Sequence, residues 1–113
     1  PYEVCAALEH RGRRRAVIRM RALFEVFPMG PPPTARVVLT EGQGRPLGLL
    51  VDEVREMADV DPALMGSVPA LATLLPPACF RGLVTRQDRI ILLVNEDGLG
   101  GLDEVVQFYA TGT

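Results

Sequence analysis

Prolines and glycines divide this chain into short apolar runs, and that division limits what it can fold into. The 113 residues include ten prolines and eleven glycines, most of them lying between apolar runs. Proline removes a backbone donor and glycine favours turns, so long helices are excluded over most of the chain. The pattern predicts an all-β fold class, mainly short strands with short helical turns.

Three hairpins account for most of the apolar runs. The expected strands are Val4–Glu9, Arg14–Arg19, Ala35–Glu41, Pro46–Val54, Phe80–Thr85 and Arg89–Val94. The expected turns are Arg11-Gly12, Gly42-Gln43-Gly44 and Gln87-Asp88. Within the near-continuous apolar run "LGLLVDEV" we expect Val51 to lie in the core, so Val51→Asp would unfold the domain.

Helical segments are expected to be few and short. Met20–Phe24 reads as one helical turn. Asp61 and Pro62 favour a second turn at Pro62–Met65, because aspartate is a good N-cap and proline suits the first helical position. The tail, Asp103–Tyr109, has the pattern of an amphipathic helix.

The two ends of the chain show a similar order of elements. When "AALEHRGRRRAVIRMRAL" is laid on "GLVTRQDRIILLVNEDGL" without a gap, Leu8 falls on Val84 and Val17 on Leu93. The length suits one core rather than two. We therefore expect one domain, 1–113, with similar β units around 4–27 and 80–102 and a central hairpin at 35–54.

Charge and cysteine usage favour a cytoplasmic protein with no membrane insertion. The formal net charge is -2 and the pI about 5.4, which gives no general attraction to nucleic acid. No apolar run approaches the roughly 20 residues of a membrane span, and no signal peptide opens the chain. Cys5 and Cys79 lie in apolar segments without metal-ligand spacing, so both are expected to be buried, reduced thiols.

The segment Leu8–Met20 holds five of the twelve basic residues, all of them arginine, and the only histidine. If Arg14–Arg19 is a strand, Arg13 and Arg15 share a solvated face, while Arg14 shares the other face with Ala16 and Ile18. Such a basic run is typical of a surface hairpin. The alternative is a nucleic-acid-binding β-barrel that uses Arg11, Arg13, Arg14 and Arg15.

No pattern indicates catalysis, a cofactor or a metal. His10 is the only histidine and lies beside a turn, where an exposed structural role is the usual one. "EGQGRPLG" lacks the order of a phosphate-binding loop, and "NEDGLGGLDE" places its glycine too early for a calcium loop. The acidic residues Asp52, Glu53, Glu56, Asp59 and Asp61 are expected to form a solvated face. An enzyme pairing His10 with a carboxylate is the weakest alternative.

Three segments, in order, resemble the CheW family, the coupling proteins of bacterial chemotaxis. "LEHRGRRRAVIRMRALF" resembles the family's "NLRGxxxPVxDLRxxF". "ARVVLTEGQGRPLGLLVDEVREM" is similar to the next hairpin, in which "hGhhVDxV" (h apolar) is the most recognisable part. "FRGLVTRQDRIILLVNEDGL" resembles the last one, "LxGhhxhxxRhhhLhDhxxL".

The resemblance implies two SH3-like five-stranded β-barrel subdomains sharing one core, and a non-enzymatic adaptor without a cofactor. It implies docking onto the regulatory domain of the chemotaxis-type histidine kinase, and onto the cytoplasmic tip of a chemoreceptor in a groove between the barrels. The family has first strands that precede the segment matched here, so we expect the first barrel to be incomplete. Exposed strand edges would favour a homo-oligomer, which is also the basis of an assembly-only alternative.

The family's positions carry over residue by residue. Arg11 and Gly12 match its Arg-Gly, Gly48 matches the glycine of its "GhhVD" strand, and Asp52 matches its aspartate. Its receptor-contact positions fall near Ala6, Arg14, Arg36 and Gly48, so the expected partner-binding residues are Ala6, Arg11, Gly12, Arg14, Arg36 and Gly48. This sequence departs from the family in having Arg14 and Arg36 where apolar residues are common, Glu9 for Asn, Ala16 for Pro and Arg19 for Asp.

Overall fold

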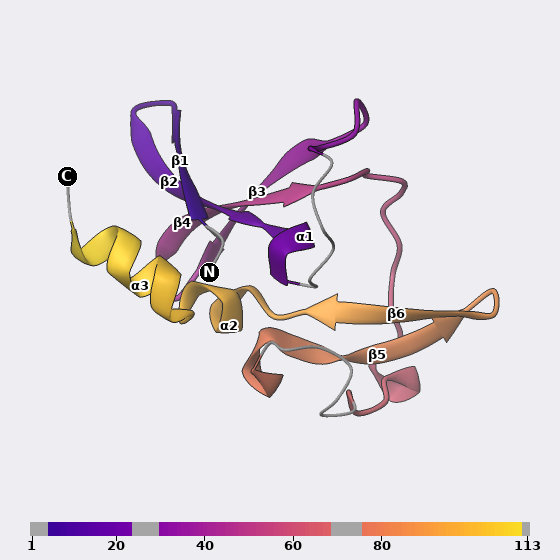
Figure 1. The fold of residues 1–113 in the computed structure, drawn as a ribbon. Helices are drawn as coiled ribbons and strands as arrows, with labels where there is room; N and C mark the ends of the chain where they lie inside the picture. The colour runs from indigo at the N-terminus through magenta and orange to yellow at the C-terminus, as the bar shows by residue number, and fades with distance from the viewer. Residues whose placement is uncertain (1–4, 24–29, 69–75, 112–113) are drawn as a thin grey trace.

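The described part of the chain forms six strands and a few short helices (Figure 1). The computed structural model describes residues 5–23, 30–68 and 76–111. The strands are β1 (Cys5–His10), β2 (Arg13–Arg19), β3 (Arg36–Gly42), β4 (Arg45–Val51), β5 (Phe80–Arg86) and β6 (Arg89–Val94). The helices are α1 (Met20–Leu23), η1 (Pro62–Leu64), η2 (Pro77–Cys79), α2 (Glu96–Gly100) and α3 (Asp103–Ala110). The predicted mainly β fold class is confirmed.

The strands form two sheets. β1, β2, β4 and β3 lie side by side in that order, and β5 pairs with β6 in a two-stranded sheet. All pairings are antiparallel except β2 with β4, which is parallel from Ala16 opposite Leu47 to Arg19 opposite Leu50. Of the five strands per barrel that the resemblance implies, the described residues supply four in the first unit and two in the second.

All three hairpins turn through two residues with positive φ: Arg11-Gly12, Gln43-Gly44 and Gln87-Asp88. Two left-handed residues in succession define the tight turn whose twist matches that of the flanking strands. The central turn is one residue shorter than predicted, because Gly42 pairs with Arg45 within the ladder. The β1–β2 and β5–β6 hairpins are each followed by a short helix, α1 or α2, but the division into two similar units stays a prediction.

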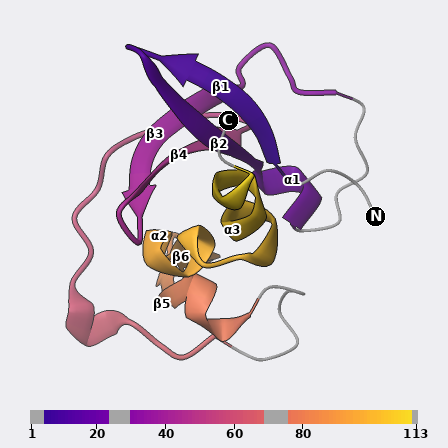
Figure 2. The same cartoon turned by 90° about the vertical axis from the view of Figure 1, so that its left-hand side faces the viewer.

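One hydrophobic cluster joins the two sheets and α3. Its buried members are Ala16, Ile18, Leu47, Cys79, Phe80, Leu99 and Val105. Viewed along α3, the first sheet lies above this helix and the β5–β6 hairpin below it (Figure 2). The cluster therefore draws on both ends of the chain, and the short helices α2 and α3 fill the space between the sheets.

The β3–β4 turn and α2 approach each other backbone to backbone. A Cβ added to Gly42 would collide with the carbonyl of Glu96, and one added to Gly100 would collide with the carbonyl of Gly42. The amide of Gln43 donates to Asp97 Oδ1 at 2.8 Å, and the side chain of Asn95 caps α2 by accepting from the amide of Asp97 at 3.2 Å. These contacts fix the first sheet against the second unit.

Two sequence predictions concern β4 and the segment that follows it. The predicted helical turn after Asp61 is present, whereas Val51, at the end of β4, is not in the core. Asp61 accepts from the amide of Ala63 at 2.9 Å and caps η1. Val51 is only half-buried and lies outside the hydrophobic cluster, so its assignment to the core is wrong. Leu47, four residues earlier in β4, is the fully buried residue of that strand, with an exposed fraction of 0%.

We predict that Leu47→Ala lowers the free energy of unfolding by about 3 kcal/mol, because it leaves a cavity in the cluster. Leu64→Ala is the matched control, since Leu64 is 73% exposed and its loss should change stability by less than about 0.5 kcal/mol. Urea denaturation followed by circular dichroism measures both. Equal effects of the two substitutions would contradict the assignment of Leu47 to the core.

Candidate partner-binding surface

The β1–β2 hairpin projects from the first sheet (Figure 1) and carries four of the six predicted partner-binding residues, three of them at or next to its turn. Arg11 and Gly12 form its turn, with φ values of 51° and 75°. Both residues are exposed, as is Arg14 just inside the strand. The tight turn thus presents Arg11 at the tip of the hairpin.

Arg14 lies over an aromatic ring of the C-terminal helix. Its guanidinium carbon is 4.1 Å from the centroid of the Phe108 ring, a cation–π arrangement. The strand places Arg14 on the same face as Ala16 and Ile18, both of which are buried in the hydrophobic cluster. The feature that stood out in the sequence, an arginine on the apolar face, is thereby explained by α3, which lies across that face.

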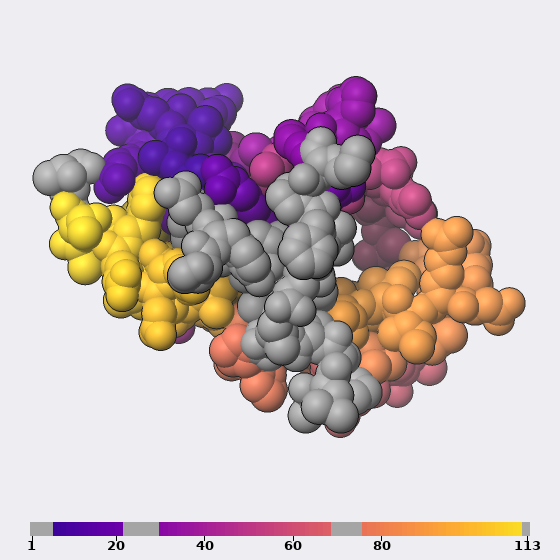
Figure 3. All heavy atoms as spheres, in the orientation of Figure 1, coloured from indigo at the N-terminus to yellow at the C-terminus, as the bar shows by residue number. Residues whose placement is uncertain are grey.

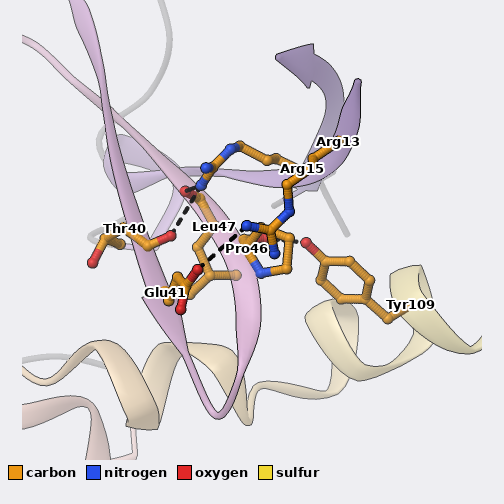
Figure 4. A network of polar contacts seen from close by, with 7 residues as sticks. All are labelled: Arg13, Arg15, Thr40, Glu41, Pro46, Leu47 and Tyr109. Atoms are coloured by element: carbon orange, nitrogen blue, oxygen red, sulfur yellow. Dashed lines mark hydrogen bonds and ion pairs between the residues drawn. The ribbon is translucent and has the colours of Figure 1, made fainter. Parts of the chain in front are cut away.

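Arg13 and Arg15 are on the opposite face of β2 and turn toward the β3–β4 hairpin (Figure 4). Arg15 Nη1 donates to the carbonyls of Thr40 at 3.1 Å and Leu47 at 3.0 Å, and its Nε is buried without a hydrogen-bond partner. Arg13 makes an exposed ion pair with Glu41 at 3.5 Å. The predicted solvated face is therefore wrong for Arg15, which is half-buried and ties β2 to two strands.

Tyr109 fastens α3 to the junction of β2 and β4 (Figure 4). Its hydroxyl accepts a hydrogen bond from the amide of Ala16 at 3.1 Å and donates one to the carbonyl of Pro46. The hydroxyl therefore bridges a backbone donor of β2 and a backbone acceptor of β4 at the point where the parallel ladder begins. Tyr109 thus lies at an interior junction of the first sheet, because β1 and β3 are its outer strands among the described residues.

Ala6 and Gly48 lie in one row across the middle of the sheet. Ala6 is opposite Val17, Val17 is opposite Gly48, and Gly48 is opposite Leu39, so all four share a face. Gly48 is buried, and an added Cβ would lie 2.8 Å from a methyl of Val37 and 3.2 Å from a methyl of Val17. The close approach of these valines accounts for a glycine at this position.

Arg36 is at the far end of the sheet from Arg14. It pairs with Val51, whereas Arg14 lies two residues before Ala16, the partner of Leu47. Six residues along a ladder correspond to about 20 Å. Arg36 is exposed, and its Nη1 donates to the carbonyls of Ala35 at 2.8 Å and Pro33 at 3.4 Å. The structure therefore does not bring Arg14 and Arg36 together.

The acidic segment after β4 is exposed and makes ion pairs. Arg21 Nε lies 2.7 Å from Asp52 Oδ1, Arg55 lies 3.3 Å from Glu53, and Arg86 lies 3.9 Å from Glu56. The prediction of a solvated acidic face is confirmed for these residues. Asp52, which matches the family's aspartate, therefore holds the region after β2 next to the end of β4.

His10 and Cys79 take no part in a shared site. His10 is half-buried at the end of β1. Cys79 is a buried free thiol, and burial raises its pKa by desolvation, which lowers its thiolate fraction. The prediction is confirmed for Cys79, while the side chain of Cys5 lies outside the described residues. Among the described residues no group of three or more His, Cys, Asp or Glu could hold a metal ion, and no helix is long and apolar enough to cross a membrane.

Sequence reasoning missed the roles of the two residues that organise this surface, Phe108 and Tyr109. They were expected only as part of an amphipathic helix. Both lie on α3, far along the chain from the hairpin that they contact, so no spacing rule relates them to Arg14 or Ala16. The one available signal was Arg14 itself, because an arginine between apolar-facing positions needs either solvent or an aromatic partner.

Comparisons with known proteins agree with this architecture. A family model described as the CheW-like domain matches residues 1–102. A solved structure, the scaffolding protein TtCheW from Thermoanaerobacter tengcongensis, matches with a TM-score of 0.73 and 23% sequence identity. The match covers 87% of this chain and 63% of TtCheW, so this chain spans less than two thirds of that protein. A search of curated proteins finds no match. Helix α3 lies beyond the segment that the family model matches.

We predict that Tyr109→Phe lowers the free energy of unfolding by about 1–3 kcal/mol, because it leaves the Ala16 amide and the Pro46 carbonyl without their shared partner. Thr111→Val is the control. It removes a hydroxyl that donates to the Phe108 carbonyl at 3.0 Å on the exposed surface, and should change stability by less than about 0.5 kcal/mol. If urea denaturation shows no difference between Tyr109→Phe and the native chain, the bridge does not stabilise the fold.

Proposed function

The chain belongs to the CheW-like domain family, and on that premise we propose that it is a non-enzymatic adaptor in chemotaxis-type signalling. Its proposed partners are the regulatory domain of a chemotaxis-type histidine kinase and the cytoplasmic tip of a chemoreceptor. On this proposal the chain acts in the cytoplasm by binding alone, without a cofactor or turnover.

The observation that carries the proposal is the exposed β1–β2 hairpin. Arg11 and Gly12 match the family's Arg-Gly, and the turn holds both in the left-handed conformation at the tip. A two-residue turn between two strands of a sheet leaves little freedom at its tip. A side chain presented on such a rigid support loses little entropy on binding, which suits a docking residue.

The receptor-contact residues carried over from the family are separated in this chain. Ala6 and Gly48 are in the middle row of the first sheet, while Arg14 and Arg36 are near its opposite ends. We propose that the hairpin end, with Arg11 and Gly12, takes the kinase. The resemblance places Arg14 among the receptor-contact positions, but Arg14 lies at the hairpin end, so we propose that in this chain it joins the kinase contact. The row through Ala6 and Gly48 and the end at Arg36 then belong to the receptor contact.

The arrangement of the arginines argues against the nucleic-acid alternative. Of the four arginines in the basic run, Arg13 is paired with Glu41 and Arg15 is turned inward onto backbone carbonyls. Arg14 covers the Phe108 ring, which is then not free to stack on a base. These engagements reduce the number of phosphates that the hairpin could neutralise.

A second candidate role, self-assembly, is supported by the exposed edge of the first sheet. Val37, Val38 and Leu39 of β3 are exposed by 38%, 40% and 41%, and among the described strands β3 pairs only with β4. On the second unit, Ile90 is 71% exposed. In the space-filling view the β5–β6 hairpin stands apart from the end of the first sheet (Figure 3). Apolar edge strands of this kind recruit further strands.

Binding to the kinase can be tested by isothermal calorimetry. We predict saturable binding, micromolar or tighter, between this chain and the regulatory domain of the chemotaxis-type kinase encoded in the same genome. Arg11→Asp should weaken it by about tenfold, because it reverses a charge at the docking tip. Aspartate tolerates the left-handed conformation that position 11 requires.

Gln87→Asp is the matched control, since Gln87 has the same φ of 51° at the same place in the β5–β6 turn. It should leave the affinity unchanged. A folded chain that shows no binding would refute the coupling role. Binding to duplex DNA that falls steeply with salt would favour the nucleic-acid alternative instead.

Self-assembly can be tested by sedimentation velocity over a range of concentrations. We predict a concentration-dependent dimer that Val38→Lys abolishes, because a lysine on an edge strand opposes strand addition. Leu64→Lys is the control, because Leu64 is also an exposed apolar residue but lies outside any strand; it should leave the dimer intact. A monomer at all concentrations would remove this second role.

A further inference from the structure

Arg14 and Phe108 form a pair whose two members come from opposite ends of the chain. The guanidinium carbon lies 4.1 Å from the ring centroid. Glu9 is opposite Arg14 in the β1–β2 register, yet within the described part of the chain no carboxylate forms an ion pair with Arg14. The guanidinium therefore packs against the ring and keeps its charge uncompensated at the surface.

The ring beneath Arg14 is firmly held. Phe108 meets Tyr109 edge to face, with centroids 5.1 Å apart and planes at 79°. Tyr109 is anchored by its hydrogen bonds to Ala16 and Pro46, and Val105, one turn earlier in α3, is fully buried. Phe108 thus provides a fixed support for a side chain that would otherwise lose much rotamer freedom on binding.

We propose that Phe108 is a positioning residue that holds the Arg14 guanidinium toward an acidic surface of the protein partner. The inference rests on the proposed adaptor function and deepens it by naming the chemistry of the contact. A guanidinium stacked on a ring uses its face for the ring and leaves the N–H donors at its edge for a partner. Those donors match the two oxygens of a carboxylate.

Charge complementarity favours a protein surface with exposed carboxylates as the partner that contacts Arg14. Arg11, at the tip of the same hairpin, likewise makes no ion pair with a carboxylate of the described residues, whereas Arg13 is already paired with Glu41. Two arginines without a carboxylate partner among the described residues suit one or two carboxylates of another protein. A nucleic-acid backbone would need a longer basic track, and the whole chain carries a formal net charge of -2.

The pair can be tested by a double-mutant cycle read by isothermal calorimetry, with the kinase regulatory domain as the probe. Native chain, Arg14→Gln, Phe108→Leu and the double variant are each titrated. We expect each single variant to weaken binding by about tenfold, and the double variant to bind no more weakly than Arg14→Gln alone. Coupling of that kind arises only if Phe108 acts through Arg14.

Two controls separate positioning from general damage. Arg89→Gln removes an exposed arginine from the other end of the molecule and should leave affinity unchanged. Phe108→Tyr keeps the ring and should retain native affinity. Thermal melts confirm that each variant is folded, and Phe108→Met replaces Phe108→Leu if the leucine variant does not fold, because methionine fills the space without a ring.

The outcomes distinguish this inference from the proposed function. If the native chain binds the kinase domain and Phe108→Leu binds equally well, the positioning role is wrong while the adaptor function stands. Additive losses in the double variant would also overturn it, since Phe108 would then act independently of Arg14. Failure of the native chain to bind refutes both. Arg14-dependent binding to duplex DNA in place of the kinase domain would show that the partner is a phosphate backbone and overturn the proposal.

Discussion

The parallel ladder between β2 and β4 is the contact on which the rest of the structure depends. It joins residues that are far apart in the chain, from Ala16 opposite Leu47 to Arg19 opposite Leu50, and turns two separate hairpins into one four-stranded sheet. Its buried side chains, Ala16, Ile18 and Leu47, form one side of the hydrophobic cluster. Without this ladder, each hairpin would be a two-stranded ribbon, which is marginally stable at best in water.

Two side chains, Tyr109 and Arg15, hold β2 against the β3–β4 hairpin at the point where that ladder begins. The Tyr109 hydroxyl bridges Ala16 and Pro46 from one face, and Arg15 donates to the Thr40 and Leu47 carbonyls from the other. The two faces of β2 therefore serve different purposes. One face packs against the core and α3, and the other face is bonded to the β3–β4 hairpin. The run of arginines therefore stabilises the fold through Arg15 as well as forming part of the surface.

The strands and the helical turn at η1 could be predicted from the sequence because interactions between residues close in the chain determine them. Apolar runs between turn residues located all six strands, and Asp61-Pro62 located η1, since capping and proline geometry act within a few residues. Family motifs identified the fold because three of them occur in the right order. The parallel pairing of β2 with β4 was not predictable in the same way, because no periodicity specifies which distant strand lies beside β2.

The errors at Val51 and Arg15 have the same origin. The continuous apolar run of β4 predicted a strand covered on both faces, but the hydrophobic cluster reaches Leu47 and Leu49 and stops before Val51. Strand alternation placed Arg15 on the face opposite the core, which is correct, yet it could not show that the β3–β4 hairpin presents two carbonyls there. In both cases the pattern gave the direction of a side chain, while its surroundings depended on strands elsewhere in the sequence.

Arg14 shows how a contact with a distant part of the chain changes the structural role of a residue. By alternation alone it is a charge on an apolar face, which is costly if the charge is buried without a partner. Helix α3 resolves the conflict, because the Phe108 ring accepts the guanidinium while the hairpin keeps it at the surface. The substitution of arginine where the family has an apolar residue is thus compatible with the fold because of a helix that lies outside the segment matched by the family model. The arginine in the hairpin changes the chemistry of the proposed docking surface and packs on a ring from the far end of the chain, so the hairpin and α3 form one structural unit.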